Sequence, residues 1–272
     1  NEVRLIVCCL LDECYGDFKL VAEMEGITTQ CFKYEKIKRG TPKGYTGNIM
    51  IKINAKLGGI NCTLASRLPD PDSVAASSVF QSPPASLSWV FDRPCMLMGI
   101  DVSHGETSSS TESVAAVCGT MNGSCTQYAG VFSVNTQGQE AVEHLSDAAS
   151  SLLETFKKTN KTYPETIIVF RDGVGDGQFE TVTTTEVAAI KAAIKKTGTS
   201  IKLSVVICLK GHSTRFFGEE SGNNGPSYIN ACPGLCIDGG GKENSITSGV
   251  FNEFYLNSHV AIQGTAKCCK YT

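Results

Sequence analysis

The run Thr166-Ile-Ile-Val-Phe-Arg-Asp172 is an apolar segment that ends in a carboxylate and leads directly into the glycine-rich turn Gly173-Val-Gly-Asp-Gly177. Short apolar runs bounded by turn residues are typical of buried strands. In an open α/β sheet, side chains at the carboxyl ends of parallel strands face the ligand crevice. The segment therefore predicts a buried strand that presents Asp172 to a functional site.

A second carboxylate, Asp101, stands near the end of the apolar run Met96-Leu-Met-Gly-Ile-Asp-Val102. An unpaired buried carboxylate is costly, so an Asp in such a run either caps the strand or faces a site. If the two strands are neighbours, Asp101 and Asp172 point into one cleft, and paired carboxylates suit divalent cations. The spacing alone leaves open that both are ordinary aspartates at strand ends.

The elements around these two runs indicate a mixed α/β domain. Apolar residues recur at three- and four-residue steps from Val142 to Phe156, which predicts an amphipathic helix. A second helix with Val182 and Ile194 on one face is expected to end at Gly198. The resulting order is β-β-β-α-β-α-β. Besides the strand at Thr166–Phe170, strands are expected at Cys95–Val102, Ser113–Gly119, Tyr128–Val134 and Ile201–Leu209.

The composition is that of an ordinary folded chain. Among 272 residues, 24 are Lys or Arg and 27 are Asp or Glu, which gives a net charge of −3. With 41% apolar residues, these values exclude disorder, collagen-like repeats and coiled coil. The longest apolar run, Leu5 to Leu11, is far shorter than the roughly 20 residues that span a bilayer, so no membrane partner is expected. Nucleic-acid binding would have to come from local charged patches.

The 13 cysteines are too few for a disulfide scaffold, and several stand in apolar runs, where a thiol behaves as a small hydrophobe. Cys232 and Cys236 have no second ligand pair near them, which argues against a structural zinc site. The simplest interpretation is an intracellular chain whose cysteines are reduced. The expected location is the cytoplasm, with the nucleus as a second compartment.

Two regions separate along the chain. Residues 1–67 contain an apolar strand at Val3–Leu11 and a helix at Tyr45–Ala55. Residues 68–92 lack a periodic apolar face and are rich in Ser, Ala and Pro, which predicts a connector. Residues 93–272 form the second region, in which the Gly- and Asn-rich residues 218–245 are expected to form a loop or lid. Because the chain opens on Asn1 and its last element has no stop signal, we expect a piece of a longer protein.

Three segments of the second region resemble, in this order, the signature blocks of the PIWI domain of Argonaute proteins. They are Gly99-Ile-Asp-Val-Ser-His104, Phe170-Arg-Asp-Gly-Val-Gly-Asp-Gly-Gln178 and Phe254-Tyr-Leu-Asn-Ser-His-Val-Ala-Ile-Gln-Gly-Thr265. The block Lys52-Ile-Asn-Ala-Lys-Leu-Gly-Gly59 resembles the end of the MID lobe in the same family. The resemblance implies that residues 93–272 are a C-terminally truncated, RNase H-like PIWI domain and that residues 1–67 are part of an α/β MID lobe.

The resemblance also implies a slicer site, which in this family uses two Asp, a Glu finger and a fourth His or Asp. Asp101 and Asp172 match the two metal-binding aspartates, with Mg²⁺ or Mn²⁺ as cofactor. Glu140, 32 residues before Asp172, matches the Glu finger, and Glu143 is the alternative one helical turn later. The family's fourth ligand follows a further helix and is expected beyond Thr272.

A 5′-phosphate is bound by converging cations and hydrogen-bond donors. Tyr15 and Lys19, and Lys52 and Lys56, stand four residues apart, which puts each pair on one face if the segments are helical. On spacing alone, a solvated lysine face is the simpler interpretation. The resemblance implies instead that Tyr15, Lys19, Gln30, Lys52 and Lys56 bind the guide's 5′-phosphate and stack its first base.

The resemblance implies further contacts to the guide backbone. In two places the chain departs from the family pattern: Lys210-Gly-His-Ser213 replaces Lys-Arg-His-His, and Ala266-Lys267-Cys268 replaces Ser/Ala-Arg-Pro. Each lost phosphate contact removes about 0.7 to 0.9 from the salt slope of binding. The lysines from Lys33 to Lys43 are expected to be a solvated loop. The backbone-contacting residues expected from the resemblance are Lys210, His212, Arg215, His259, Gln263 and Lys267.

Together these features predict small-RNA-guided binding and endonucleolytic cleavage of complementary RNA in gene silencing. The expected partners are a small guide RNA, the target RNA and silencing-complex proteins. The alternative is a guide-loaded platform that binds target RNA without cutting, although a pure binder needs none of Asp101, Glu140 and Asp172. An unguided RNase H-like nuclease, such as a transposase, would not need the residues expected to bind the 5′-phosphate.

Overall fold

The computed structural model describes residues 3–11, 14–38, 40–42, 44–64, 85–104, 112–136, 138, 141–222, 225–238 and 252–272. The chain forms two compact units. One comprises Asn1–Asp92 with Asn122–Tyr128, and the other comprises Arg93–Met121 with Ala129–Thr272.

The first unit contains a small parallel βαβ arrangement. Its strands pair in parallel, with Ile6 opposite Thr29, and a helix connects them, as parallel strands require. The predicted strand at Val3–Leu11 and helix at Tyr45–Ala55 are both present with adjusted ends. Residues 68–84 of the predicted connector lie outside the described residues. The elements are β1 (Ile6–Leu10), α1 (Tyr15–Met24), β2 (Thr29–Lys33), α2 (Glu35–Lys38), α3 (Tyr45–Lys56), a 3-10 turn (Ala85–Leu87) and α4 (Ser88–Phe91).

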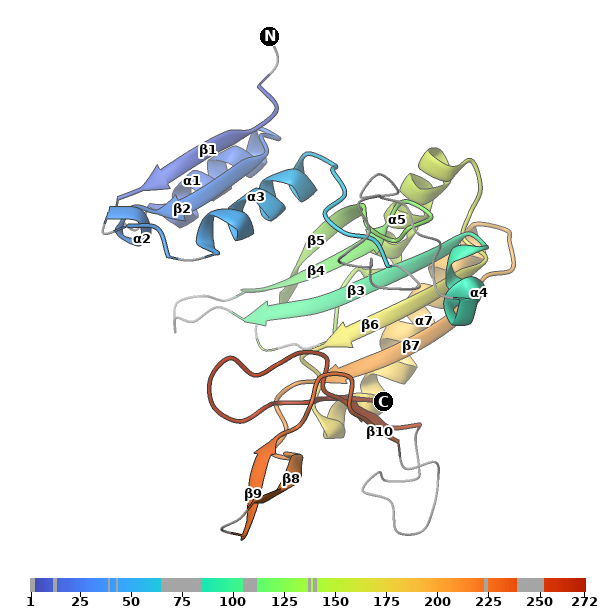
Figure 1. The fold of residues 1–272 in the computed structure, drawn as a ribbon. Helices are drawn as coiled ribbons and strands as arrows, with labels where there is room; N and C mark the ends of the chain where they lie inside the picture. The colour runs from blue at the N-terminus through green and yellow to red at the C-terminus, as the bar shows by residue number, and fades with distance from the viewer. Residues whose placement is uncertain are drawn as a thin grey trace. The chain divides into compact units, whose positions relative to one another are not determined.

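The second unit is built on a mixed sheet, which has eight strands in the described part of the chain, in the order β10-β11-β12-β7-β6-β3-β4-β5 (Figure 1). The three central strands β3, β6 and β7 are parallel to one another, whereas β4 and β12 pair with them in antiparallel fashion. The strands are β3 (Cys95–His104), β4 (Glu112–Thr120), β5 (Tyr128–Thr136), β6 (Thr166–Asp172), β7 (Lys202–Leu209), β10 (Cys236–Asp238), β11 (Phe254–Leu256) and β12 (Cys269–Tyr271).

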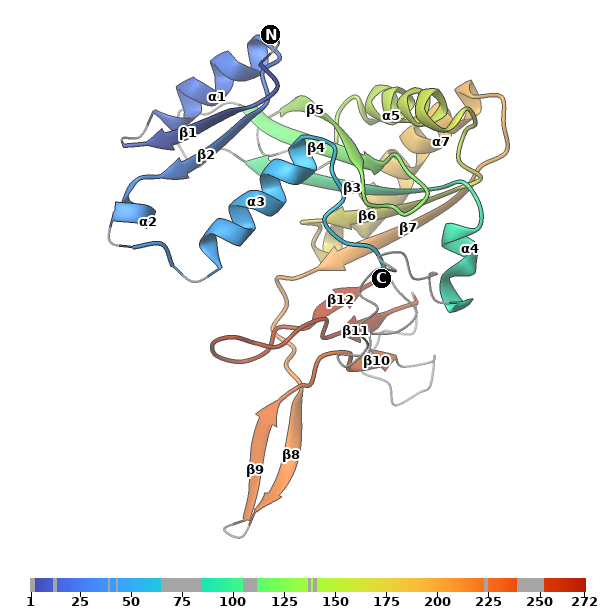
Figure 2. The ribbon, with the colours of Figure 1, turned by 45° about the horizontal axis from the view of Figure 1, so that its top comes forward.

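Two helices cover one face of this sheet, α5 (Leu145–Asn160) and α7 (Val187–Lys196) (Figure 2). A 3-10 turn (Asp176–Gln178), the short α6 (Phe179–Thr181) and a π-helical turn (Val182–Glu186) lead from β6 into α7. Gly198 follows α7 with a φ of +70°, so it ends that helix as predicted. The predicted order β-β-β-α-β-α-β over β3 to β7 is therefore confirmed.

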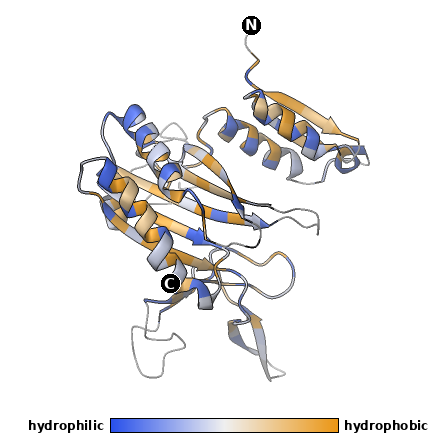
Figure 3. Cartoon of the chain, turned by 180° about the vertical axis from the view of Figure 1, so that it is seen from behind, coloured by the Kyte–Doolittle hydropathy of each residue, from blue (hydrophilic) through white to orange (hydrophobic). Residues whose placement is uncertain are grey.

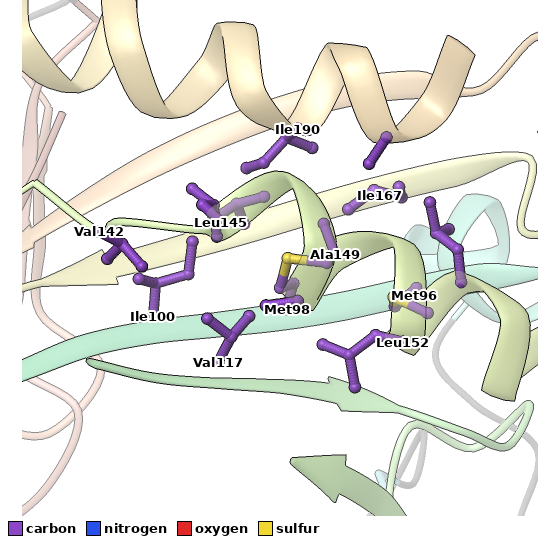
Figure 4. Packing of buried hydrophobic residues seen from close by; sticks show 14 of the residues in the cluster. Met96, Met98, Ile100, Val117, Val142, Leu145, Ala149, Leu152, Ile167 and Ile190 are labelled. Carbon is purple, nitrogen blue, oxygen red and sulfur yellow. The ribbon is translucent and has the colours of Figure 1, made fainter. Parts of the chain in front are cut away.

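The core lies between the helices and the sheet. Leu145, Ala149 and Leu152 of α5 recur at the predicted helical spacing and pack on Met98 of β3, with Ile190 of α7 beside them (Figure 4). Burying each large apolar side chain contributes about 1.5–3 kcal/mol. The central strands are accordingly largely hydrophobic along their length (Figure 3).

The prediction of a loop over residues 218–245 is wrong for its described part. β8 (Phe217–Gly222) and β9 (Gly225–Asn230) form an antiparallel hairpin that stands out from the sheet, and β10 follows. Of the glycines that suggested a loop, Gly222 and Gly225 are described, and they pair with each other at the end of the hairpin. Residues 239–245 lie outside the described residues.

The composition predicted that the chain has neither a disulfide scaffold nor a membrane-spanning segment. No disulfide joins any of the 13 cysteines, all of which are described. Among the described helices, none combines the length and the apolar character needed to cross a bilayer.

Replacing a side chain at the centre of this core should destabilise the second unit. Leu152 is 1% exposed, so Leu152→Ala removes buried apolar surface and leaves a cavity, which should cost about 2–5 kcal/mol. Lys158→Ala, on the exposed side of the same helix, is the control and should change the free energy of unfolding by less than about 0.5 kcal/mol. Urea unfolding measures both, and equal effects would contradict the packing described here.

Candidate functional site

Asp101 and Asp172 lie on the sheet face opposite the helices. Side chains alternate between the two faces of a strand. Met98 and Ile100 of β3 are buried in the core under α5, so Asp101 points to the other side. In β6, Val169 is buried in the same core, and Asp172 alternates away from it.

The pairing of strands brings these two aspartates together. β3 and β6 are parallel neighbours, and Ile100 pairs with Arg171. Asp101 and Asp172 are the next residues on their strands, so both stand where the parallel pairing of β3 with β6 ends, although β3 itself continues to His104 beside β4. The condition for a shared cleft, that the two strands be adjacent, is met.

A lysine that follows the next strand, β7, contacts one of these two carboxylates. Lys210 directly follows β7, and its ammonium forms an ion pair with the Asp172 carboxylate. The side chains of Lys210 and Asp172 are 67% and 29% exposed. The hydrogen bond to Asp172 and the charges of Asp172 and Asp101 raise the pKa of Lys210, although burial acts in the opposite sense. This corner of the sheet therefore attracts positive charge.

Hydrogen bonds to the neighbouring backbone fix the orientation of both carboxylates. Gly173 has a φ of +82°, a conformation that favours glycine, and it turns the chain sharply after Asp172. One oxygen of Asp172 accepts a hydrogen bond from the Gly173 N–H at 2.9 Å. One oxygen of Asp101 accepts from the Val102 N–H at 3.0 Å. Each carboxylate is thus tied to the backbone through one oxygen.

The third predicted catalytic residue, Glu140, lies outside the described residues. Its alternative, Glu143, accepts a hydrogen bond from the Thr136 N–H at 3.2 Å, and hydrogen bonding to Thr136 lowers the pKa of Glu143. Glu143 is therefore engaged in the connection between β5 and α5. Within the described ranges, no three His, Cys, Asp or Glu side chains converge as a metal site. Asp101 and Asp172 still fit a divalent cation, because they offer hard oxygen donors where a cation, Lys210, is already held.

A second cluster lies in the first unit, where α1, β2 and α3 converge. Lys56 donates hydrogen bonds to the Thr29 carbonyl oxygen at 2.6 Å and to Gln30 Oε1 at 2.9 Å. Lys19 donates to Thr29 Oγ1 at 2.8 Å and lies 3.6 Å from a carboxylate oxygen of Glu23. Three of the five residues predicted to bind the 5′-phosphate, Lys19, Gln30 and Lys56, are therefore brought together.

The lysines of this cluster repel one another. Burial, and then the charge of Lys19, lower the pKa of Lys56, and the charge of Lys52 adds to the effect. Lys52 is thus near enough to act on Lys56, although no hydrogen bond joins them among the described contacts. An anion placed between these ammonium groups would relieve the repulsion.

A hollow of about 880 Å³ lies at the carboxyl ends of β1 and β2, whereas Thr29 and Gln30 of the cluster stand at the start of β2. Tyr15, the remaining predicted residue, lines it together with Tyr45 from the start of α3. Lys33 and Lys36 also line it, although the sequence suggested that they belong to a solvated loop. Lys33 is the last residue of β2 and Lys36 follows soon after it, and the carboxyl ends of parallel strands are where ligands bind.

The residues expected to contact the guide backbone are in part engaged within the fold. His212 Nε2 lies 2.7 Å from the Cys268 carbonyl oxygen, and its ring packs edge-on against Tyr255. Arg215 donates to the carbonyl oxygens of His212 and Thr214 at 2.8 and 2.7 Å. Both side chains thus help to hold the segments that follow β7 and precede β12. Exposed positions are taken by His259, Gln263 and Lys267.

Comparison with known proteins places this arrangement in a family. Residues 5–272 match the family model of the Piwi domain. Protein argonaute 3 of Oryza sativa subsp. japonica is 31% identical over 279 residues, which cover 100% of this chain and 23% of that protein. Protein argonaute-2 of Drosophila melanogaster is 33% identical over 278 residues, covering 100% of this chain and 20% of that protein. The chain spans about a quarter of such relatives or less.

Solved structures show the same fold. Argonaute of Kluyveromyces polysporus with a guide RNA has a TM-score of 0.76 at 22% identity, over 98% of this chain and 30% of that one. The C-terminal lobe of a budding yeast Argonaute has a TM-score of 0.74 at 21% identity, over 98% of this chain and 52% of that one. The predicted fold class, an RNase H-like PIWI domain preceded by part of an α/β MID lobe, is confirmed. The chain therefore belongs to the Argonaute/Piwi family.

Proposed function

We propose that this chain binds a small guide RNA and cleaves complementary RNA in gene silencing, in the cytoplasm and also in the nucleus. The observation that carries the proposal is the position of Asp101 and Asp172. Both lie on one face of the neighbouring parallel strands β3 and β6, next to the last residues that pair between these strands. Membership of the Argonaute/Piwi family supports it. So does the likeness to a solved Argonaute that holds a guide RNA.

In this proposal the first unit, as part of a MID lobe, binds the 5′ end of the guide. Lys19 and Lys56 supply charge-assisted hydrogen bonds to the phosphate, which are roughly twice as strong as neutral ones. The Gln30 side chain orients Lys56 through its 2.9 Å contact, and Lys52 adds charge. Tyr15, on the wall of the hollow, stacks the first base.

Cleavage is assigned to the sheet edge of the second unit. Asp101 and Asp172 would hold Mg²⁺ or Mn²⁺, and Glu140 is proposed as the third carboxylate. When bound, such a cation lowers the pKa of an attacking water and stabilises the leaving oxygen. Lys210 must release Asp172 and then becomes available to a guide phosphate. Hydrolysis adds water across the bond between phosphorus and the 3′ oxygen, so the products carry a 3′-hydroxyl and a 5′-phosphate.

A second candidate is a guide-loaded platform that binds target RNA without cutting and represses it through silencing-complex proteins. Two observations favour it. Over the described residues, no third metal-binding side chain joins Asp101 and Asp172. The Asp172 carboxylate is also already paired with Lys210.

Removal of Asp172 should separate the two candidates. With a 5′-phosphorylated guide, a matched labelled target and Mg²⁺ or Mn²⁺, the native protein that carries this chain should make a single cut opposite the middle of the guide. Asp172→Ala should slow the cut about a thousandfold, because several kcal/mol of charge stabilisation are lost. Asp147→Ala, an exposed carboxylate on α5, is the control and should cut normally. Target binding without any cut in the native protein would favour the platform.

Loss of Lys56 should weaken binding of the guide's 5′ end. A hydrogen bond to a charged group is worth about 1.5–3 kcal/mol, so Lys56→Met should lower affinity for a 5′-phosphorylated guide roughly 10- to 150-fold. A 5′-hydroxyl guide should bind equally well to both proteins. Lys158→Met serves as the charge-matched control, and fluorescence anisotropy measures the affinities. An equal loss for both guides would mean that Lys56 does not bind the phosphate.

The lowered pKa of Lys56 also predicts a pH dependence. The phosphate favours the charged ammonium, so binding raises the pKa of Lys56 and takes up a proton once pH exceeds the pKa of the free chain. Affinity for the 5′-phosphorylated guide should therefore fall as pH rises through that range. Lys56→Arg stays charged and should show a flatter profile. Identical profiles for the two proteins would exclude Lys56 as the titrating group.

A further inference from the structure

Buried side chains, not strand pairing, hold the segment 141–143 between β5 and α5. Asn135, which is buried on β5, donates to the Ala141 carbonyl oxygen at 2.9 Å and accepts from the Glu143 N–H at 3.1 Å. The Val142 N–H donates to Glu186 Oε1 at 3.1 Å. Ser133 Oγ and the Thr136 N–H of β5 also donate to Glu143, to its carbonyl oxygen at 3.3 Å and to its carboxylate at 3.2 Å. The segment is thus held on one side by β5 and on the other by Glu186 of the helical layer.

Glu186 is in turn fixed by an arginine beside the catalytic aspartate. Arg171 is 0% exposed and Glu186 2%. Nε of Arg171 lies 2.9 Å from Oε2 of Glu186, and Nη2 lies 3.1 Å from Oε1. Arg171 also donates to the carbonyl oxygen of Asp172. A continuous polar path therefore runs from the backbone at Val142 to the backbone at Asp172.

Stability alone is a poor explanation for this pair. Burying two charges costs several kcal/mol per ion, and hydrophobic replacements of buried pairs are often as stable or more so. The pair is also not closely packed on every side. A cavity of about 210 Å³ lies beside Ala141, and Arg171, Gln178 and Glu186 line it as well. Glu186 ends a π-helical turn, a feature that often occurs at functional sites.

We propose that Asn135, Arg171 and Glu186 are positioning residues for the cleavage centre. They fix the place of the segment 141–143, which directly follows Glu140 in the sequence, relative to the strand end that carries Asp172. The catalytic consequence rests on the proposed function, because it requires that Glu140 serve cleavage. The positioning of the segment by the ion pair can be measured independently of any activity.

The test replaces the ion pair with apolar side chains in the native protein that carries this chain. Arg171→Met combined with Glu186→Leu removes the acceptor for the Val142 N–H without leaving a buried charge unpaired. The matched control, Lys270→Met with Glu253→Leu, removes another largely buried ion pair among the described residues of this unit, whose atoms lie 3.0 Å apart. Amide hydrogen exchange at 141–143 should rise at least about tenfold in the first variant and stay unchanged in the control.

Cleavage kinetics give the second measurement. The single-turnover cleavage rate of the first variant should fall at least about tenfold, with guide and target affinities unchanged within about twofold. Arg171→Met with Glu186→Gln restores a neutral acceptor for the Val142 N–H, so it should recover both the exchange protection and the rate. A purely structural role would not distinguish Gln from Leu at position 186.

Two outcomes would overturn the proposal. One is unchanged exchange at 141–143 in the Leu variant, and the other is a loss of guide affinity as large as the loss of rate. If the wild-type protein binds targets but does not cut them, the slicing function fails, and the exchange measurement still decides whether the pair positions the segment.

Discussion

The parallel pairing of β3 with β6 is the constraint on which the proposed cleavage centre depends. Side chains alternate along a strand, so a shift of one residue in this register would move Asp172 to the helical face. The core prevents such a shift, because Met98 and Val169 are buried under α5 in the observed register. The packing of apolar side chains on one face thus sets the place of the carboxylates on the other.

Charge is treated differently in the two units. In the first, uncharged oxygens of Thr29 and Gln30 accept hydrogen bonds from Lys19 and Lys56. The two ammonium groups are compensated only in part, by Glu23 at 3.6 Å from Lys19. In the second, the aspartates are partly compensated by Lys210. The first arrangement is suited to an anion and the second to a cation, which are the two ligand types that a guided nuclease must bind.

The strands and helices from β3 to β7 could be predicted from sequence because their burial is periodic. Met98 and Leu152, for example, carry the alternation and the helical spacing that those elements require. The strands β10, β11 and β12 were missed because three residues are too few to show a period. Asp101 and Asp172 could be placed by motif, but not the ion pair of Asp172 with Lys210, which depends on β7 lying next to β6.

The Arg171–Glu186 pair was also invisible in sequence. Its members stand fifteen positions apart in the sequence, with an irregular helical connection between them. No short-range sequence pattern predicts that they meet. The lysine cluster of the first unit, around Lys19 and Lys56, shows the same limit. The four-residue step from Lys52 to Lys56 placed both on one helix face, but only the fold shows that Lys56 reaches Thr29 and Gln30 on a neighbouring strand.

The ion pair of Lys210 with Asp172 has a thermodynamic consequence. One ammonium group cannot neutralise a carboxylate and a nucleic-acid phosphate at the same time. Any phosphate that draws Lys210 away leaves Asp101 and Asp172 with more uncompensated negative charge, and therefore with a stronger attraction for cations. By linkage, a cation at the carboxylates frees Lys210 and strengthens phosphate binding in the same measure. Ligands of opposite charge would thus bind cooperatively through a single shared side chain.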